Sequence, residues 1–234
     1  MIIIILGSSR NGLRGFLILE STKLDLGNAS VRIIWFFSIL AYLGGNDFFM
    51  KKHNLFSVRD LCEIAMLTAI AIVLGLFCEI KIGQNGGSIG FAMIPLFFIC
   101  YRHGILKGFI ASGVIYGVVA CAYDGYGWAC FPLDYLFAYG SLCIVSLFYK
   151  LIFKSESKVM PYVYICLSIL AACTLRLAFH VISGMVLWET PFEGSFIYNI
   201  AYVGPSCLLC MVLFSLLYEP FKMLDARFPV SFRI

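Results

Sequence analysis

Six apolar stretches, separated by short polar turns, organise the chain from residue 61 onwards. They cover Leu61–Phe77, Ile89–Tyr101, Ile105–Tyr123, Phe131–Phe153, Pro161–Trp188 and Phe196–Tyr218. A helix needs about 20 largely apolar residues to cross the hydrocarbon core of a bilayer. The second stretch is short and contains Pro95, which predicts a broken or tilted segment, and the fifth is long enough to tilt. The pattern predicts an all-α integral membrane protein with a bundle of six transmembrane helices.

Composition identifies the bilayer as the solvent of this chain. Hydrophobic residues make up 62% of its 234 residues and charged residues 13%, with a mean hydropathy of +0.95. Soluble domains contain about 45–50% apolar and about 25% charged residues. The spans leave no room for a soluble catalytic domain. The ten cysteines show no paired metal-binding spacing and lie mostly in apolar runs, so we expect reduced, buried thiols and no metal or cofactor.

Basic residues alternate between the loops and predict the orientation. Eleven Lys and Arg residues fall on one side, namely Lys51, Lys52, Arg59, Arg102, Lys107, Lys150, Lys154, Lys158, Lys222, Arg227 and Arg233. The opposite loops contain Lys81 as their one basic residue. By the positive-inside rule, both termini are expected to be cytoplasmic. The net charge of +4 therefore reflects membrane topology, and no nucleic-acid partner is expected.

A few polar residues inside the predicted spans are candidates for function, because such residues are costly in a bilayer. Asp134 lies near the outer end of the fourth span, and Asn199 lies in the sixth. In the fifth span, His180, Gly184 and Trp188 follow one another at intervals of four and share a helix face, which Arg176 extends inward. The predicted topology places all but Arg176 at one depth, in the outer half of the membrane.

This set suits a flat, cationic, nitrogen-rich heterocycle. Asp134 would supply counter-charge, and the face of Trp188 would make a cation–π contact worth about 2 kcal/mol when desolvated. Asn199 both donates and accepts hydrogen bonds, as an aminopyrimidine edge requires. Gly184 would leave room beside the ring, and Tyr126 belongs to an outer loop placed to cover the pocket.

Each candidate also has a purely structural interpretation, which the sequence leaves open. Trp188 suits the aromatic belt at a membrane surface, and His180 suits a hydrogen bond between helices. Arg176 suits an internal ion pair, and Asp134 suits the first turn of a helix. Ala65 and Ala69, four residues apart in the first span, suit either internal packing or a docking face for a partner membrane subunit.

Two other classes of protein fit the residues less well. An intramembrane enzyme would need a nucleophile–base pair or paired acids on neighbouring faces. Asp134 is the only acid that we place within the spans, and no nucleophile motif surrounds Ser141. We therefore expect no catalytic residues. A structural or sensory membrane protein without a ligand would need Asp134 and His180 for stability alone.

From Met50 onwards the chain resembles the thiamine-specific substrate-binding (S) subunits of energy-coupling factor (ECF) transporters. The matching segments are Gly86–Pro95, Arg102–Gly108, Asp134-Tyr135, Arg176–Gly184 and Tyr198–Pro205. The resemblance implies a six-helix bundle of ECF S-component type that binds thiamine from outside the cell. It also implies residence in the bacterial plasma membrane and no reaction by the chain itself. A transmembrane coupling subunit would deliver the substrate, and two cytoplasmic ATPase subunits would use the ATP.

The resemblance also assigns residues. The substrate-binding residues would be Asp134, Tyr135, His180, Gly184, Trp188 and Asn199, with Tyr126 at the lid. Ala65 and Ala69 would dock on the coupling subunit. Some relatives have Glu at the position of Asp134 and a Trp in the first outer loop, where this chain has Gly86-Gly87-Ser88. Another vitamin, or a thiamine precursor, is the alternative ligand.

The first 49 residues differ from the rest and are expected to be an N-terminal extension of the membrane domain, residues 50–234. Met50 precedes two lysines and resembles a natural start. Asn11–Gly15 and Leu24–Arg32 can be encoded by RNA that resembles the two conserved boxes of the thiamine-pyrophosphate riboswitch. A translated RNA leader and an ordinary extension both fit this segment.

Overall fold

The structure, a computed structural model, describes residues 57–82 and 87–230. These residues belong to the unit Lys52–Ile234. The predicted N-terminal extension, residues 1–49, lies outside the described residues, as do both of its leader-like strings.

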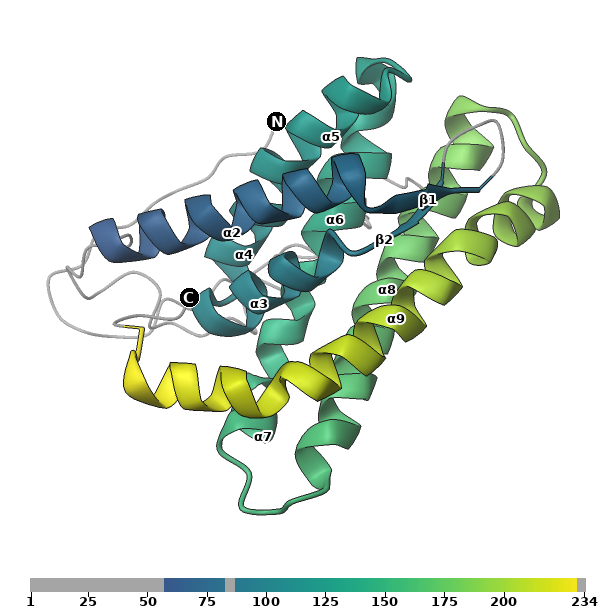
Figure 1. Cartoon of the computed structure of the whole chain (residues 1–234). Helices are drawn as coiled ribbons and strands as arrows, with labels where there is room; N and C mark the ends of the chain where they lie inside the picture. Colours follow the sequence, from purple (N-terminus) through teal and green to yellow (C-terminus); the bar gives the residue numbers. More distant parts are fainter. Residues whose placement is uncertain (1–56, 83–86, 231–234) are drawn as a thin grey trace, which may run out of the picture. The chain divides into compact units, whose positions relative to one another are not determined.

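The described elements are almost all helical (Figure 1). In chain order they are α2 Val58–Phe77, β1 Glu79–Lys81, β2 Ser88–Gly90, α3 Met93–His103, α4 Ile105–Phe109, η2 Ile110–Tyr116, α5 Gly117–Asp124, η3 Trp128–Cys130, η4 Phe131–Phe137, α6 Ala138–Gly140, η5 Ser141–Phe148, α7 Tyr149–Phe153, α8 Met160–Leu187 and α9 Phe192–Arg227. The short helices join into longer rods, so that Ile105–Asp124 and Trp128–Phe153 are each long enough to span a bilayer. Within the rods, η2 and η4 are wide π-helical turns and η5 is a tighter 3₁₀ stretch.

Among the described residues, five helices are long and apolar enough to cross a membrane. They agree with five of the six predicted spans. The second predicted span, Ile89–Tyr101, is instead divided between strand β2 and helix α3. Helix α3 has 11 residues, about 16 Å at 1.5 Å per residue, which is too short for a hydrocarbon core of about 30 Å. Pro95 does not break it, because Pro95 lies in the first turn, where proline is tolerated.

A small hairpin follows α2 and corrects the expectation of a purely helical chain. Strands β1 and β2 are antiparallel, with Ile80 opposite Ile89. Gly87, the residue before β2, has φ +81°, and a Cβ there would lie 2.6 Å from Tyr202 Cδ1 of α9. A side chain at this position would therefore strain the backbone and strike the Tyr202 ring. The hairpin lies close against α9 for this reason.

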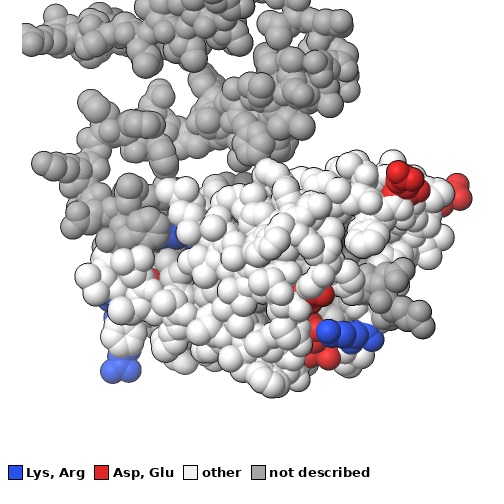
Figure 2. All heavy atoms as spheres, turned by 90° about the horizontal axis from the view of Figure 1, so that it is seen from above, with Lys and Arg blue, Asp and Glu red and all other residues white. Residues whose placement is uncertain are grey.

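Helices α8 and α9 run side by side and pack closely against each other (Figure 1). Helix α9 has 36 residues and contains Pro205 and Pro220, each of which removes an internal hydrogen bond and permits a bend. Helix α2 is the most weakly packed span, with only 22% of its most apolar window buried. On the face drawn in Figure 2, uncharged side chains cover the broad middle and the few charges lie mainly near the ends, as a bilayer requires.

We predict that Gly113→Ala lowers the stability of the bundle. A Cβ at Gly113 would lie 2.7 Å from the carbonyl oxygen of Leu136 and 3.0 Å from Gly140 Cα, so two rods would have to separate. Such overpacking costs about 1–3 kcal/mol. Thermal unfolding of the detergent-purified protein measures it. Gly204→Ala is the matched control, because its nearest neighbour atom would be 4.0 Å away. Equal melting of the two variants would contradict the prediction.

Candidate functional site

Asp134 lies in the first turn of η4 and faces α8. Its Oδ1 lies 2.9 Å from His180 Nδ1, and its Oδ2 accepts a hydrogen bond from the Ser183 hydroxyl. No side-chain hydrogen bond caps η4, so Asp134 connects two helices and does not cap its own. Within the part of the chain that the structure describes, no Lys or Arg lies within ion-pair distance of this carboxylate. Its side chain is 20% exposed, which leaves it able to accept a further, cationic partner.

The polar face of α8 is arranged around His180. Arg176 Nε donates to His180 Nε2 at 3.2 Å, so Nε2 is the accepting nitrogen and Nδ1 carries the hydrogen that faces Asp134. The Arg176 guanidinium is buried and stacks 4.3 Å from the centre of the Tyr139 ring. Arg176 therefore holds the imidazole in one orientation from one side, while Asp134 holds it from the other.

Asn199 belongs to a second polar group, on α9. Its Nδ2 donates to the carbonyl oxygen of Ser195 at 2.8 Å, and its Oδ1 accepts from the Tyr202 hydroxyl. The Tyr202 ring lies edge-on to His180, with ring centroids 5.7 Å apart. The structure thus brings Asp134, His180 and Asn199 into one neighbourhood through Tyr202.

Gly184 lies against α9. A Cβ at this position would lie only 2.2 Å from the Ser195 hydroxyl oxygen of α9. Ser195 itself is buried and donates to the carbonyl oxygen of Val181 at 3.0 Å. In this structure Ser195 occupies the space beside Gly184, so the glycine allows the two helices to approach closely.

The aromatic candidates lie at the rim of this neighbourhood. Trp188 follows the last residue of α8 and is 56% exposed, and its ring meets that of Tyr126 edge-on, with centroids 6.4 Å apart. Tyr135 is buried and donates to Asp124 Oδ2 at 2.9 Å. For the described residues, no hydrogen bond in the structure joins Trp188, Tyr126 or Tyr135 to the Asp134–His180 pair.

Sequence reasoning missed Ser183 and Ser195 and gave Tyr202 no role in the site. Helical spacing contains a signal for all three. Ser183 is three residues after His180, Tyr202 is three residues after Asn199, and Ser195 is four residues before Asn199, so each pair shares a helix face. What spacing does not show is that Ser195 lies against Gly184 of α8, because that depends on the close approach of α9.

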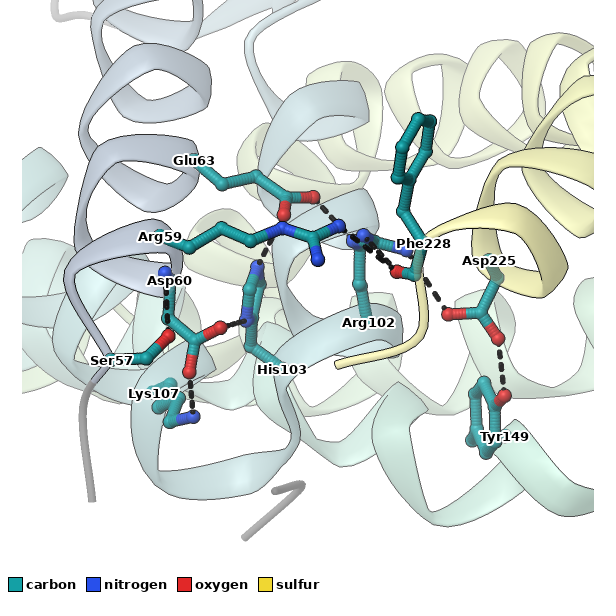
Figure 3. A network of polar contacts seen from close by, with 10 residues as sticks. All are labelled: Ser57, Arg59, Asp60, Glu63, Arg102, His103, Lys107, Tyr149, Asp225 and Phe228. Carbon is teal, nitrogen blue, oxygen red and sulfur yellow. Dashed lines mark hydrogen bonds and ion pairs between the residues drawn. The ribbon is translucent and has the colours of Figure 1, made fainter. Parts of the chain in front are cut away.

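A separate cluster of charged residues lies at the opposite end of the bundle. It corrects two expectations. Asp60 and Glu63 lie within span α2, so Asp134 is not the only acid in the spans. Arg102 and Lys107 are buried and are not free loop cations. His103, the last residue of α3, is also buried and lies beside both acids of α2 (Figure 3).

Ala65 and Ala69 are exposed on α2. The buried residues of α2 are Asp60, Ile64, Thr68 and Ala71, which lie on the other face of the helix. Ala65 and Ala69 therefore do not pack inside the bundle in this structure. Of the two interpretations offered by the sequence, an outward-facing docking surface is the one that their exposure permits.

The chain is similar to known thiamine transporters. A family model described as "Thiamine transporter protein (Thia_YuaJ)" matches residues 61–225. The protein "Thiamine transporter ThiT" of Bacillus subtilis (strain 168) is 32% identical over 173 residues, which are 68% of this chain and 89% of that protein. A solved structure of ThiT from Listeria monocytogenes superposes with a TM-score of 0.60 at 22% identity, over 71% of this chain and 97% of the other. That last similarity supports the fold alone.

We predict that Gly184→Ala separates α8 from α9 and lowers stability by about 1–3 kcal/mol, as overpacking does. The double variant Gly184→Ala with Ser195→Gly removes the clashing hydroxyl, so part of the loss should be recovered even though the Val181 hydrogen bond is absent. Thermal unfolding of the wild type, both single variants and the double variant completes the cycle. Additive losses in the double variant would show that the two residues do not clash.

Proposed function

The chain belongs to the thiamine transporter protein family (Thia_YuaJ), and from this membership we propose that it is the substrate-binding subunit of an energy-coupling factor importer for thiamine. It is a multi-pass membrane protein of a transporter family and not an enzyme. Beyond family membership, we propose the ligand, the residues that bind it, the membrane topology and the partner subunits.

The observation that carries the proposal is the partly exposed carboxylate of Asp134. Among the described residues its partners are His180 and Ser183, with no permanent cation in contact. Thiamine joins a permanently cationic thiazolium ring to an aminopyrimidine. Asp134 would offset that charge, which is worth more in a low-dielectric site than in water. Asn199 would bind the aminopyrimidine edge after Tyr202 releases its Oδ1.

The aromatic rim would complete the site. Trp188 and Tyr126 contact each other at the rim, and closing over a bound ring would desolvate the cation and add a cation–π contact. Tyr135 would act indirectly, because its hydroxyl is occupied by Asp124. The acid at the centre favours a cationic vitamin, or the cationic precursor of one, over an anionic vitamin.

The proposed topology has both termini in the cytoplasm and the β1–β2 hairpin, the end of α5 and the α8–α9 loop on the outer side. In this topology the hairpin and α3 together form the second of six membrane crossings. Helix α3 alone is too short to cross, and neighbouring helices would shield the non-helical part of this crossing from lipid. Basic residues at the opposite end, including Arg59, Lys150 and Arg227, support this orientation in the bacterial plasma membrane. Residues 50–234 would form the binding domain, without a contribution from residues 1–49.

The proposed partners are a transmembrane coupling subunit and two cytoplasmic ATPase subunits. Their docking face on this chain would be the exposed side of α2, where Ala65 and Ala69 permit a helix to approach closely. Exposed Met66 and Val73 extend the same face.

We expect thiamine to quench tryptophan emission of the purified full chain in a saturable titration, and riboflavin and biotin to give no saturable response. Asp134→Asn and Trp188→Ala should each weaken binding, by about 2 kcal/mol or more for Trp188 if it stacks on a desolvated cation. For Trp188→Ala, which has lost a fluorophore, thiamine affinity is measured by titration calorimetry. Trp128→Ala is the matched control, as an exposed tryptophan with a ring partner other than Tyr126. Wild-type affinity in both site variants would refute the site.

We also expect Ala65→Trp and Ala69→Trp to leave thiamine binding unchanged and to stop uptake into vesicles that contain the partner subunits. A bulky ring on this face would prevent close helix contact. Leu167→Trp, on an exposed position of α8, controls for a large ring in lipid. Normal uptake by both α2 variants would rule out this face as the docking surface.

A further inference from the structure

A network of buried charges closes the inner end of the bundle, opposite the Asp134 site (Figure 3). Lys107 Nζ of α4 donates to Asp60 Oδ2 of α2 at 2.8 Å. His103, at the end of α3, directs Nδ1 at Asp60 Oδ1, 4.0 Å away, and Nε2 at Glu63 Oε2, 3.7 Å away. Lys107 and His103 are both fully buried.

Arg102 joins three helices within this network. It forms an ion pair with Glu63 of α2, a hydrogen bond of 3.2 Å to Asp225 Oδ1 of α9, and one of 2.6 Å to the carbonyl oxygen of Phe228. Tyr149 of α7 donates to the second oxygen of Asp225. The planar guanidinium with its several donors suits such a junction, which a lysine ammonium could not reproduce.

Few buried apolar residues hold helix α2 in place. Of its 20 residues, four are buried, and only Ile64 and Ala71 among these are apolar. An open apolar groove of about 340 Å³ lies along its outer half. The groove is lined by Leu67, Ile70, Leu74, Phe91, Ile94, Pro95, Phe98 and Phe221.

In a bilayer no hydrophobic force presses α2 onto the bundle, because lipid tails are as apolar as the neighbouring side chains. The partners that lipid cannot offer are charged ones. If either ion pair were broken, Asp60 or Glu63 and its buried cationic partner would lose their counter-charges, which is costly. The ion pairs with Lys107 and Arg102 therefore decide where the inner half of α2 lies, although buried ion pairs add little to overall stability.

We propose that Arg102 and Lys107 are positioning residues, which hold α2 at the angle that presents its Ala65 and Ala69 face outward. Asp60 and Glu63 lie on the held side of the helix, and Ala65 and Ala69 lie on the exposed side. A rotation or tilt of α2 that breaks the ion pairs would turn the exposed face as well. The effect of this position on a coupling partner rests on the proposed function, whereas the position itself does not.

The test measures the position of α2 directly in the full chain, in lipid nanodiscs. Cys62 on α2 and Cys78 are the exposed cysteines of the described residues. In a Cys78→Ser background, one spin label is placed on Cys62 and a second on Leu170→Cys, an exposed site on α8. The pair reports the distance between α2 and α8. The Cys78→Ser protein without Leu170→Cys is labelled in parallel, and its signal shows how much label attaches to other cysteines. Arg102→Gln and Lys107→Gln are the variants. Lys150→Gln, an exposed lysine at the same end, is the control with the same change of charge.

We expect one narrow distance distribution in the wild type and in Lys150→Gln, and a shifted or broadened one in both cluster variants. Thiamine affinity should stay within about twofold, because the Asp134 site lies at the other end, while uptake with the partner subunits should fall about tenfold or more. Arg102→Lys keeps the charge but loses the fork and should give an intermediate shift. It also serves if Arg102→Gln fails to fold. Unchanged distributions in Arg102→Lys and Lys107→Gln would overturn the proposal.

The two proposals fail separately in this experiment. Absence of thiamine binding by the wild type would refute the proposed ligand and leave the distance measurement valid. A second, rescuing variant distinguishes positioning from general damage. Asp60→Asn together with Lys107→Gln removes both charges of one pair. We expect it to restore the melting temperature relative to Lys107→Gln alone and to leave the distance distribution broad. A distribution restored to wild-type width would show that the pair does not position α2.

Discussion

Every charge buried in a bilayer needs a partner within the protein, and this requirement organises both ends of the bundle. At the inner end, Arg102 and Lys107 pair with acids of α2 and α9. At the outer end, Asp134 is paired with the neutral donors of His180 and Ser183. The Arg102–Lys107 cluster is closed, because each of its acids contacts one of these two cations. The outer one is open, because its carboxylate has no cation in contact among the described residues.

Helix α9 takes part in both ends. Its outer half contains Ser195 and Asn199, which contact α8 beside the open site, and its inner end contains Asp225, which accepts from Arg102. Pro205 lies between the two regions and weakens the helix at that point. Helix α9 is thus held near Asp225 by its contact with Arg102. Near Ser195 it packs closely against α8, because Gly184 has no side chain there.

Sequence patterns predicted the positions of five spans and the lengths of four of them well, because apolar length follows bilayer thickness. The last span, Phe196–Tyr218, was predicted too short, since α9 extends over Phe192–Arg227. The patterns failed at Ile89–Tyr101, because a short apolar run is compatible with a strand as well as with a helix. Spacing also placed His180 and Gly184 on one face of α8. It could not show that Gly184 faces Ser195, or that Tyr135 turns to Asp124, since both depend on which helix lies opposite.

By itself, the sequence determined that this is a helical membrane protein with a few costly polar residues grouped at one depth. Those properties follow from local composition and helical period, which need no knowledge of neighbours. Tertiary structure alone decided which charges are buried and with whom they pair. Arg102 and Lys107 look like ordinary loop cations in the sequence, and they become the junction of α2 with the bundle only because acids from distant segments lie against them.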